Sequence, residues 1–505
     1  MSAAVLPLFA IVPLLLSGLT VLVRHPVLDR VLLIGVPLAS ATGGLLLLLE
    51  HRQVPVLAHG VGGFVPGVSI PFVSDALSAL MLTVTGISTA ACSWFLVGTG
   101  EDRYRFVPPL ALMLTGGVNG ALLTGDLFNL FVFVEVMLLP SYALIAVTGT
   151  WRRLGIGRLF ILVNLLTSTF LLIGIGFVYG VTGTVNLAAL AGQAARDPRA
   201  GLALAVVLMA LAIKGGVVPV HGWLPRSYPA TSAAVMALFA GLHTKVALYA
   251  IYRVYAMGYG GRPAPWLWVL LLVAVLTMVV GAVSTINERR IRAALAFQMV
   301  SGVGHILLGL VVFTAASLAA GIFYLVHHVI TMAALLLSAG AIEHTYGSGR
   351  FDRLSGLMRR DRLVTIVFAL GLFSLVGLPP TSGVWGKVAL MASAAGAPDW
   401  QSWVLIGAVM VASLASLMAL QRLWAEVFWG PPMERYRPDD PHTGRGEAIP
   451  LPDAVVIRPG IAAPGAVMLV LSVALFLAAG LVWPFAQSAG AGLLEVGPYV
   501  SAVLK

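Results

Sequence analysis

Apolar runs of about 20 residues recur along almost the whole chain, and each is long enough to cross a lipid bilayer as an α-helix. Of the 505 residues, 59% are hydrophobic and only 10% are charged, whereas soluble domains carry about 25% charged residues. Every backbone polar group must find a partner inside a bilayer. Runs of this length therefore predict an all-α, polytopic membrane protein.

We predict fourteen transmembrane helices. Their approximate ranges are 3–22, 30–50, 75–98, 106–124, 127–149, 158–181, 202–221, 231–256, 264–285, 293–313, 316–342, 363–395, 402–429 and 462–484. Most connecting loops are short. The exception is 430–461, which is polar and rich in proline, and for which we predict no regular structure.

The net charge of +10 raises the question of nucleic-acid binding. The arginines, however, lie at short loops between apolar runs rather than in one patch, which is typical of membrane topology signals. Twenty arginines lie at loops after odd-numbered spans, and five lie at loops after even-numbered spans. By the positive-inside rule, both termini are then outside the cytoplasm. We expect no nucleic-acid partner.

The lysines are distributed differently from the arginines. Lys214, Lys245 and Lys387 lie inside predicted spans, and the fourth lysine is the C-terminal Lys505. An arginine keeps its proton in a protein, whereas a buried lysine can lose its proton. The chain therefore places its titratable amines in the membrane.

Glu135 lies near the middle of the fifth span, within FNLFVFVEVMLLPSYALIAV. A carboxylate at this depth is costly unless it faces the bundle interior and has a partner. Lys214 and Lys245 are the candidate partners. Burial favours the neutral form of each group and pairing favours the charged forms, so a small change in geometry would move a proton. The alternative interpretation is a static buried ion pair.

Histidines accompany the lysines in the later spans. His243 stands two residues before Lys245, His305 lies in the tenth span, and His327 and His328 lie in the eleventh. Histidine titrates near neutral pH, although a hydrogen-bonded core residue is an equally good interpretation of His305. Neighbouring residues on a helix point about 100° apart. We therefore expect only one of the adjacent pair to face the interior.

Two spans combine a helix break with a lysine. KGGVVP begins at Lys214, and GLPPTSG (377–383) precedes Lys387. Broken helices at matching places in two halves are typical of inverted-repeat transporters. Spans 4–8 and 9–13 each contain five helices, and an odd-numbered unit repeated in tandem must be inverted. The alternative is a pair of ordinary proline kinks without function.

The segments around these residues resemble a known family. They are FNLFVFVEVMLLPSYALIAV, GGVVPVHGWLPRSYPATSAAVMALFAGLHTKVALYAIYRV and GLPPTSGVWGKVAL. They are similar to the antiporter-like subunits shared by respiratory complex I, membrane-bound hydrogenases and Mrp-type cation/proton antiporters. The resemblance extends over roughly residues 75–430. Within this group, LPRSYPATSAAVMALFAGLHTKV and the chain length are most similar to the Mrp D subunits.

The resemblance implies two inverted five-helix repeats with discontinuous helices 7 and 12. Each repeat forms a half-channel, and a hydrophilic axis at mid-membrane joins them. The single transmembrane domain then has four parts: three N-terminal helices (1–100), the first repeat (106–258), the second inverted repeat (264–430), and a cytoplasmic loop with the last helix (431–505).

The resemblance also implies a secondary ion transporter rather than an enzyme, without cofactors. It would work with other antiporter subunits in a bacterial plasma membrane and exchange Na⁺ or K⁺ for protons. The residues implied for proton translocation are Glu135, Lys214, Lys245, His327 or His328, and Lys387, with His243 and His305 as secondary candidates. Met332 stands where many family members have a lysine. No residues are indicated for a metal or transported cation.

Two other functions stay open at this point. One is a proton-pumping subunit of respiratory complex I or of a membrane-bound hydrogenase. The other is a structural membrane scaffold with fixed ion pairs. The partner subunits would distinguish a proton-pumping subunit of a redox complex from an Mrp-type antiporter. Normal transport after neutralisation of the three intramembrane lysines would favour the structural scaffold.

Overall fold

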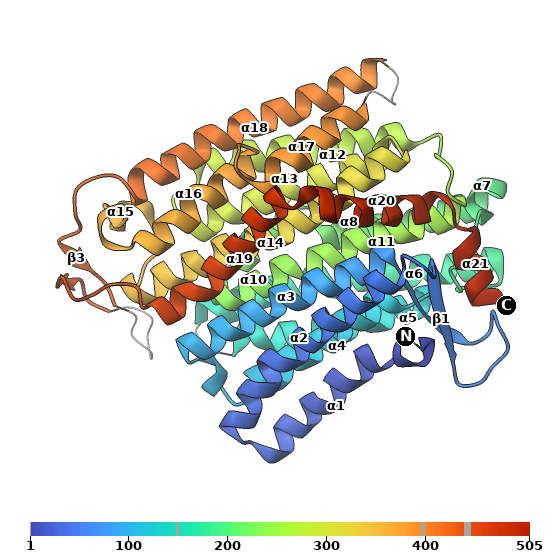
Figure 1. Ribbon diagram of the computed structural model, residues 1–505, viewed down its shortest axis with the longest axis horizontal. Helices are drawn as coiled ribbons and strands as arrows, with labels where there is room; N and C mark the ends of the chain where they lie inside the picture. The colour runs from blue at the N-terminus through green and yellow to red at the C-terminus, as the bar shows by residue number, and fades with distance from the viewer. Residues whose placement is uncertain (1, 148–150, 395–398, 439–445) are drawn as a thin grey trace.

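The computed structural model describes residues 2–147, 151–394, 399–438 and 446–505. Within these residues the chain forms a bundle of helices that run in roughly the same direction (Figure 1). Twelve helical segments are long and apolar enough to cross a membrane, and Val107–Leu123 and Arg362–Val376 are shorter apolar helices. The fourteen predicted spans are thereby confirmed within the described residues. The predicted helix ends at 149 and 395 lie outside them.

The elements of the first half, in chain order, are η1 (Ala3–Val5), α1 (Leu8–Val23), α2 (Pro26–Glu50), β1 (Val56–Val61), β2 (Ile70–Asp75), α3 (Ala76–Thr99), η2 (Glu101–Arg103), α4 (Val107–Leu123), α5 (Leu127–Ala146), α6 (Trp151–Thr182), α7 (Gln193–Arg196), α8 (Pro198–Gly215), α9 (Trp223–Ser227), η3 (Tyr228–Ala230), α10 (Ala233–Gly241) and α11 (His243–Tyr259).

The elements of the second half are α12 (Leu267–Ser284), η4 (Thr285–Asn287), α13 (Ile291–Val311), α14 (Ala315–Tyr346), η5 (Phe351–Arg353), α15 (Leu357–Arg360), α16 (Arg362–Val376), α17 (Ser382–Ser393), α18 (Asp399–Val427), β3 (Arg435–Tyr436), β4 (Ile449–Pro450), α19 (Pro459–Leu477), α20 (Ala479–Leu494) and α21 (Gly497–Leu504).

Helix α14 lies at the centre of the bundle. It packs against α3, α10, α13, α16, α17, α19 and α20. The most apolar stretch of α14 is completely buried, and so is that of the segment formed by α10 and α11. The corresponding stretch of the first span, which contains α1, is only 28% buried. Figure 1 shows α1 and α18 at opposite edges of the bundle. The polar residues on α11 and α14 are therefore inside the protein and away from lipid.

A β-hairpin at one end of the bundle was not predicted from the sequence. Strands β1 and β2 pair antiparallel, with Val56 opposite Asp75. Asp75 then caps α3, because its carboxylate accepts a hydrogen bond from the Ser78 backbone N–H at 3.0 Å. The hairpin lies at the same end as both chain termini, and the loop that contains β3 lies at the other end (Figure 1).

Both predicted helix breaks are present. Helix α8 ends at Gly215, and Gly216 follows with φ of +76°. Helix α16 ends at Val376, and Gly377 follows with φ of +91°. Backbone in this left-handed region favours glycine, which commonly terminates helices in this way. A few non-helical residues then lead into α9 and α17, so each span is discontinuous inside the bundle.

Three features differ from the predictions. The eighth span is also interrupted, because Leu242 separates α10 from α11 with φ of −112° and ψ of −65°. Arg253, which the arginine count assigns to the following loop, is buried inside α11. The last span is longer than predicted, because α20 continues from α19 after Ala478. Leu242 carries no glycine or proline signal of its own, so the sequence pattern did not indicate this break.

Glycines allow α12 and α13 to pack closely. A Cβ added to Gly304 would lie 2.4 Å from the backbone nitrogen of Met278, and one added to Gly281 would lie 2.3 Å from that of Ser301. We expect Gly304→Val to destabilise the protein by about 1–3 kcal/mol, because a packed helix backbone cannot move aside freely. Thermal unfolding of the purified protein in detergent measures this effect.

Gly176→Val is the matched control for this prediction. A Cβ at Gly176 on α6 would meet no atom within 4 Å, and the change in helix propensity is the same at both positions. Equal melting temperatures for the two variants would contradict the close packing of α12 and α13.

Candidate functional site

The first cluster of buried polar groups joins α5, α6 and α8. The Ser168 hydroxyl donates a hydrogen bond to the Glu135 carboxylate and accepts one from the Lys214 ammonium at 2.8 Å. Lys214 and Ser168 are both buried, and Glu135 is half-buried. The sequence predicted a direct contact between the carboxylate and a lysine. Instead, a hydroxyl from a third helix bridges the two charged groups.

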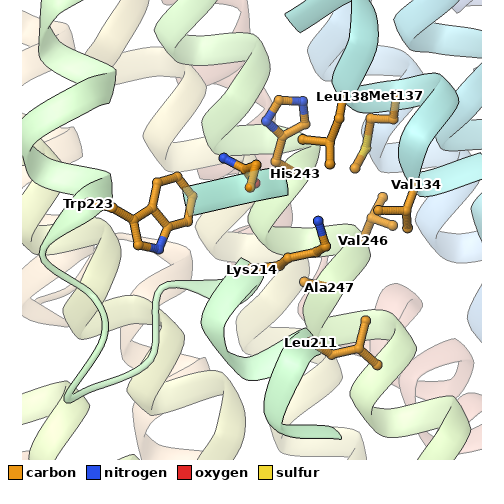
Figure 2. A pocket seen from close by; sticks show the side chains of 10 residues that line it. Val134, Met137, Leu138, Leu211, Lys214, Trp223, His243, Val246 and Ala247 are labelled. Carbon is orange, nitrogen blue, oxygen red and sulfur yellow. The ribbon is translucent and has the colours of Figure 1, made fainter. Parts of the chain in front are cut away.

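A small cavity adjoins this bridge. It leaves about 10 Å³ for the centre of a water molecule, which is roughly enough for one water. Its polar lining comes from Lys214, His243, Asn164 and Trp223, and the rest is apolar. Figure 2 shows the Lys214 amine and the His243 ring projecting toward the cavity from α8 and α11. A single water here would connect two titratable groups.

His243 lies at the start of α11, directly after the unpredicted break. Its Nε2 lies 2.8 Å from the Ser141 hydroxyl, which itself donates to the Met137 carbonyl. Since the Ser141 proton is used in that bond, Nε2 is the donor to Ser141. Nδ1 is buried and has no hydrogen-bond partner within the described residues. It is the nitrogen that can accept a proton.

Lys245 is fully buried two residues further along α11. Its ammonium donates to the Thr244 hydroxyl at 3.0 Å, and its charge acts on His328 of α14. The His328 ring packs against α13, where a Cβ on Gly302 would lie 1.9 Å from His328 Nε2. Neither ring nitrogen of His328 has a side-chain partner in the described part of the chain, and the Gln298 backbone acts on the ring. Lys245 and His328 therefore connect the first half of the bundle to the central helix.

The expectation that only one of His327 and His328 faces the interior is wrong. Both are fully buried, because α14 is surrounded by other helices and has no lipid-facing side. The two rings point to different neighbours. His327 Nδ1 lies 2.8 Å from the Ser382 hydroxyl at the start of α17, whereas His328 packs against α13.

A network of hydroxyl groups surrounds His327. It consists of Thr331 on α14, Ser374 on α16, Ser382 on α17 and Ser472 on α19, with separations of 2.8–3.3 Å. Each hydroxyl can both donate and accept a hydrogen bond. The network therefore links His327 to both sides of the second helix break and to the last span.

Lys387 lies on α17 beside the second break. Its ammonium donates to the carbonyls of Leu375 and Val376 at 3.0 and 2.8 Å and to the Ser413 hydroxyl on α18 at 2.8 Å. The two carbonyls are at the end of α16, where the break leaves them without helical partners. All three donors of the ammonium are thus used, and no carboxylate among the described residues forms an ion pair with it.

His305 on α13 lies beside these groups. Its Nδ1 donates to the Ser301 carbonyl at 2.9 Å, and its ring stacks on Tyr324 at a centroid distance of 4.9 Å. The charges of Lys387 and His327 act on it. Its Nε2 is buried and unpaired within the described residues. Nδ1 is therefore hydrogen-bonded as in an ordinary core histidine, whereas Nε2 is available to accept a proton.

We refer to these ionisable groups together as the polar row. Its members are Glu135, Lys214, His243, Lys245, His328, His327, His305 and Lys387. They lie on α5, α8, α11, α13, α14 and α17. Besides Glu135, the row contains three amines and four imidazoles, and each can gain and lose a proton. Among the described residues, no three His, Cys, Asp or Glu side chains are grouped so as to hold a metal ion.

The hydroxyl groups that connect the polar row were missed in the sequence. Ser168 lies in a Thr-Ser-Thr run, Ser382 lies in the second break, and Ser472 is isolated in an apolar run. A serine or threonine inside a helix is more often bonded to its own helix, so these residues gave no signal of contacts between helices. Ser472 also lies on α19, outside both predicted five-helix units. Met332, which stands where many family members have a lysine, is buried on α14. This difference from the family pattern therefore lies in the protein interior.

Residues 124–416 match the family described as NADH:quinone oxidoreductase/Mrp antiporter, transmembrane. The D subunit of the Na(+)/H(+) antiporter of Alkalihalophilus pseudofirmus is 33% identical over 425 residues, which is 82% of this chain and 84% of that protein. The protein of the same name from Bacillus subtilis is 32% identical over 451 residues, 88% of each chain.

Solved structures give the same result. A chain of the Mrp complex from Dietzia sp. DQ12-45-1b has a TM-score of 0.94 at 42% identity, covering 100% of this chain and 99% of that one. A chain of respiratory complex I from Thermus thermophilus has a TM-score of 0.77 at 22% identity, covering 97% and 99%, which shows a shared fold alone. The chain belongs to the NADH:quinone oxidoreductase/Mrp antiporter family and, within it, to the Mrp antiporter D subunits.

Proposed function

We propose that this chain is the proton-translocating subunit of a multisubunit Na⁺(K⁺)/H⁺ antiporter. Its relatives named as D subunits of Na(+)/H(+) antiporters, and its likeness to a chain of an Mrp complex, support this proposal. The observation that carries it is the polar row, which begins at the bridge between Glu135 and Lys214 and ends at Lys387. Ionisable groups inside a membrane protein mark paths of ions and protons.

Protons would pass along the polar row in the direction set by the transmembrane gradient. In the first half, Ser168 and a water in the cavity would connect Glu135, Lys214 and His243. Lys245 and His328 would carry the proton to the central helix. In the second half, His327 and its hydroxyl network would connect to Lys387, with His305 as a secondary member. Other subunits of the complex would complete the exchange of Na⁺ or K⁺.

We also propose that α4–α11 and α12–α18 are two inverted repeats, with bounds near 106–258 and 264–430, between an N-terminal unit (1–100) and a C-terminal unit (431–505). The break that contains glycine and proline lies in the fourth of five spans in each repeat, which supports this. We also propose a bacterial plasma membrane as its location, as the resemblance implies, and the arginine distribution favours both termini on the extracytoplasmic side. Figure 1 has both termini at one end of the bundle, in agreement with an even number of spans.

The fold is also similar to that of a chain of respiratory complex I. A second candidate function is therefore a proton-pumping subunit in a redox complex. Co-purification of a tagged chain from its native membrane separates the two. Small membrane subunits without redox centres would support the antiporter, and hydrophilic redox subunits would support the alternative.

The bridge between Glu135 and Lys214 gives the first test. We expect Glu135→Ala or Lys214→Ala to abolish cation-dependent proton movement in inverted membrane vesicles, because each removes a titratable group from the row. Glu426→Ala is the control, since Glu426 forms an exposed ion pair with Arg422. Co-purification of the partner subunits checks assembly. Full antiport by either row variant, in an assembled complex, would contradict the proposal.

Ser168 tests the role of the bridging hydroxyl. We expect Ser168→Ala to lower the antiport rate about tenfold to hundredfold, because a hydrogen bond to a charged group contributes about 1.5–3 kcal/mol. Ser168→Thr keeps a hydroxyl and should retain most of the activity. Thr169→Ala, which removes an exposed hydroxyl from the same helix, should have no effect. An unchanged rate in Ser168→Ala would show that the bridge is not on the path.

Lys387→Arg separates proton transfer from a structural scaffold. A guanidinium keeps the positive charge near the carbonyls of Leu375 and Val376, but it cannot release a proton. We expect this variant to assemble and to lose antiport. Lys505→Arg, at the exposed C-terminus, is the control. Retention of antiport in Lys387→Arg would favour a fixed charge with no role in transfer.

A further inference from the structure

A second polar path leaves the polar row along α11. Lys245, Tyr249 and Arg253 are four residues apart, so they lie on one face of the helix. The distance along the axis from Lys245 to Arg253 is about 12 Å, compared with about 15 Å for half of a bilayer core. All three side chains are buried. Polar groups therefore lead from Lys245 toward the bundle end that carries both termini.

Arg253 forms a buried ion pair that the polar row does not use. Its guanidinium lies 2.6 Å from the Asp75 carboxylate, and the two side chains are 4% and 10% exposed. The other terminal nitrogen, NH1, is buried and has no hydrogen-bond partner within the described residues. A buried cation is costly when it is only partly satisfied. This cost indicates that Arg253 has a use beyond holding the Asp75 carboxylate, which caps α3.

The C-terminal helix α21 covers this ion pair. The Arg253 guanidinium lies 5.1 Å from the centre of the Tyr499 ring, and Tyr499 is itself buried. On its other side, the Tyr499 hydroxyl reaches Gly125, where an added Cβ would lie 3.1 Å from it. Helix α21 also packs against β1. The ring is thus inserted between α11 and the start of α5.

Other titratable groups surround the same place. Asp126 caps α5 through the Asn129 backbone N–H at 2.8 Å, and its charge acts on Tyr499. His51, whose charge acts on Asp75, lies 2.8 Å from the Ser74 hydroxyl. These polar groups lie on the terminal side of Arg253, while Tyr249 lies on its interior side and donates to the Leu122 carbonyl.

We propose that Arg253, Asp75 and Tyr499 form a closed gate on a side branch of the proton path, between Lys245 and the membrane face that carries both termini. The proposal rests on the proposed function only in assigning protons to Lys245. A guanidinium cannot release a proton, so protons do not hop through it, and its positive charge opposes entry of a proton or Na⁺. The Tyr499 ring, packed between Arg253 and Gly125, covers the ion pair.

Tyr499→Ala tests the gate, with Tyr499→Phe as the matched control. Both variants lose the hydroxyl, but Tyr499→Phe keeps the ring over Arg253. In vesicles that contain the full complex, without Na⁺ or K⁺, we expect an imposed pH gradient to decay several-fold faster in Tyr499→Ala and at the wild-type rate in Tyr499→Phe. Adding Lys245→Ala to Tyr499→Ala should restore the wild-type rate, because the branch begins at Lys245.

Two results would overturn the proposal. One is an unchanged leak in Tyr499→Ala. The other is a leak that persists after Lys245→Ala is added, which would mean a packing defect unrelated to the branch. If Tyr499→Ala does not assemble, the double variant Asp75→Asn, Arg253→Gln removes the charges and keeps the ring, and the same leak and the same effect of Lys245→Ala are expected. Absence of a leak while Lys214→Ala still abolishes antiport would reject the gate and leave the proposed function intact.

Discussion

The arrangement of the interior depends on the cost of keeping ammonium groups away from water. Lys387 meets this cost with carbonyls that the second helix break leaves free, and with one serine hydroxyl. Lys214 meets it through Ser168, which also donates to Glu135. The second break therefore lies next to Lys387 for a chemical reason, since an unbroken helix would offer no free carbonyl at that depth.

Helix α14 connects the two halves because it is buried on every side. Its adjacent histidines point to different neighbours, His328 toward α13 and Lys245, and His327 toward the hydroxyl network at the second break. The two positions are about 100° apart around the helix, and both are in the interior because every side of α14 is covered there. Because both histidines are buried, His327 and His328 together connect the two halves of the polar row.

Hydropathy and glycine positions predicted a large part of the fold. The fourteen spans and both breaks follow from local properties, namely apolar run length and the left-handed backbone of Gly216 and Gly377. The interruption at Leu242 and the hairpin before Asp75 were missed. Gly241 is a single glycine in an apolar run, and the glycines and proline of 60–67 indicate only a loop between two spans. Arg253 was misplaced into a loop, since a charge near the end of an apolar run resembles a topology signal.

By itself, the sequence determined the membrane class, the number of spans and the ionisable members of the polar row, because each depends on residue type and spacing along one helix. Only the tertiary structure decided which groups touch. Ser168 lies between Glu135 and Lys214, Ser472 reaches His327 through Ser382, and Tyr499 covers Arg253. These contacts join helices far apart in the chain, and helix packing rather than local pattern sets their distances.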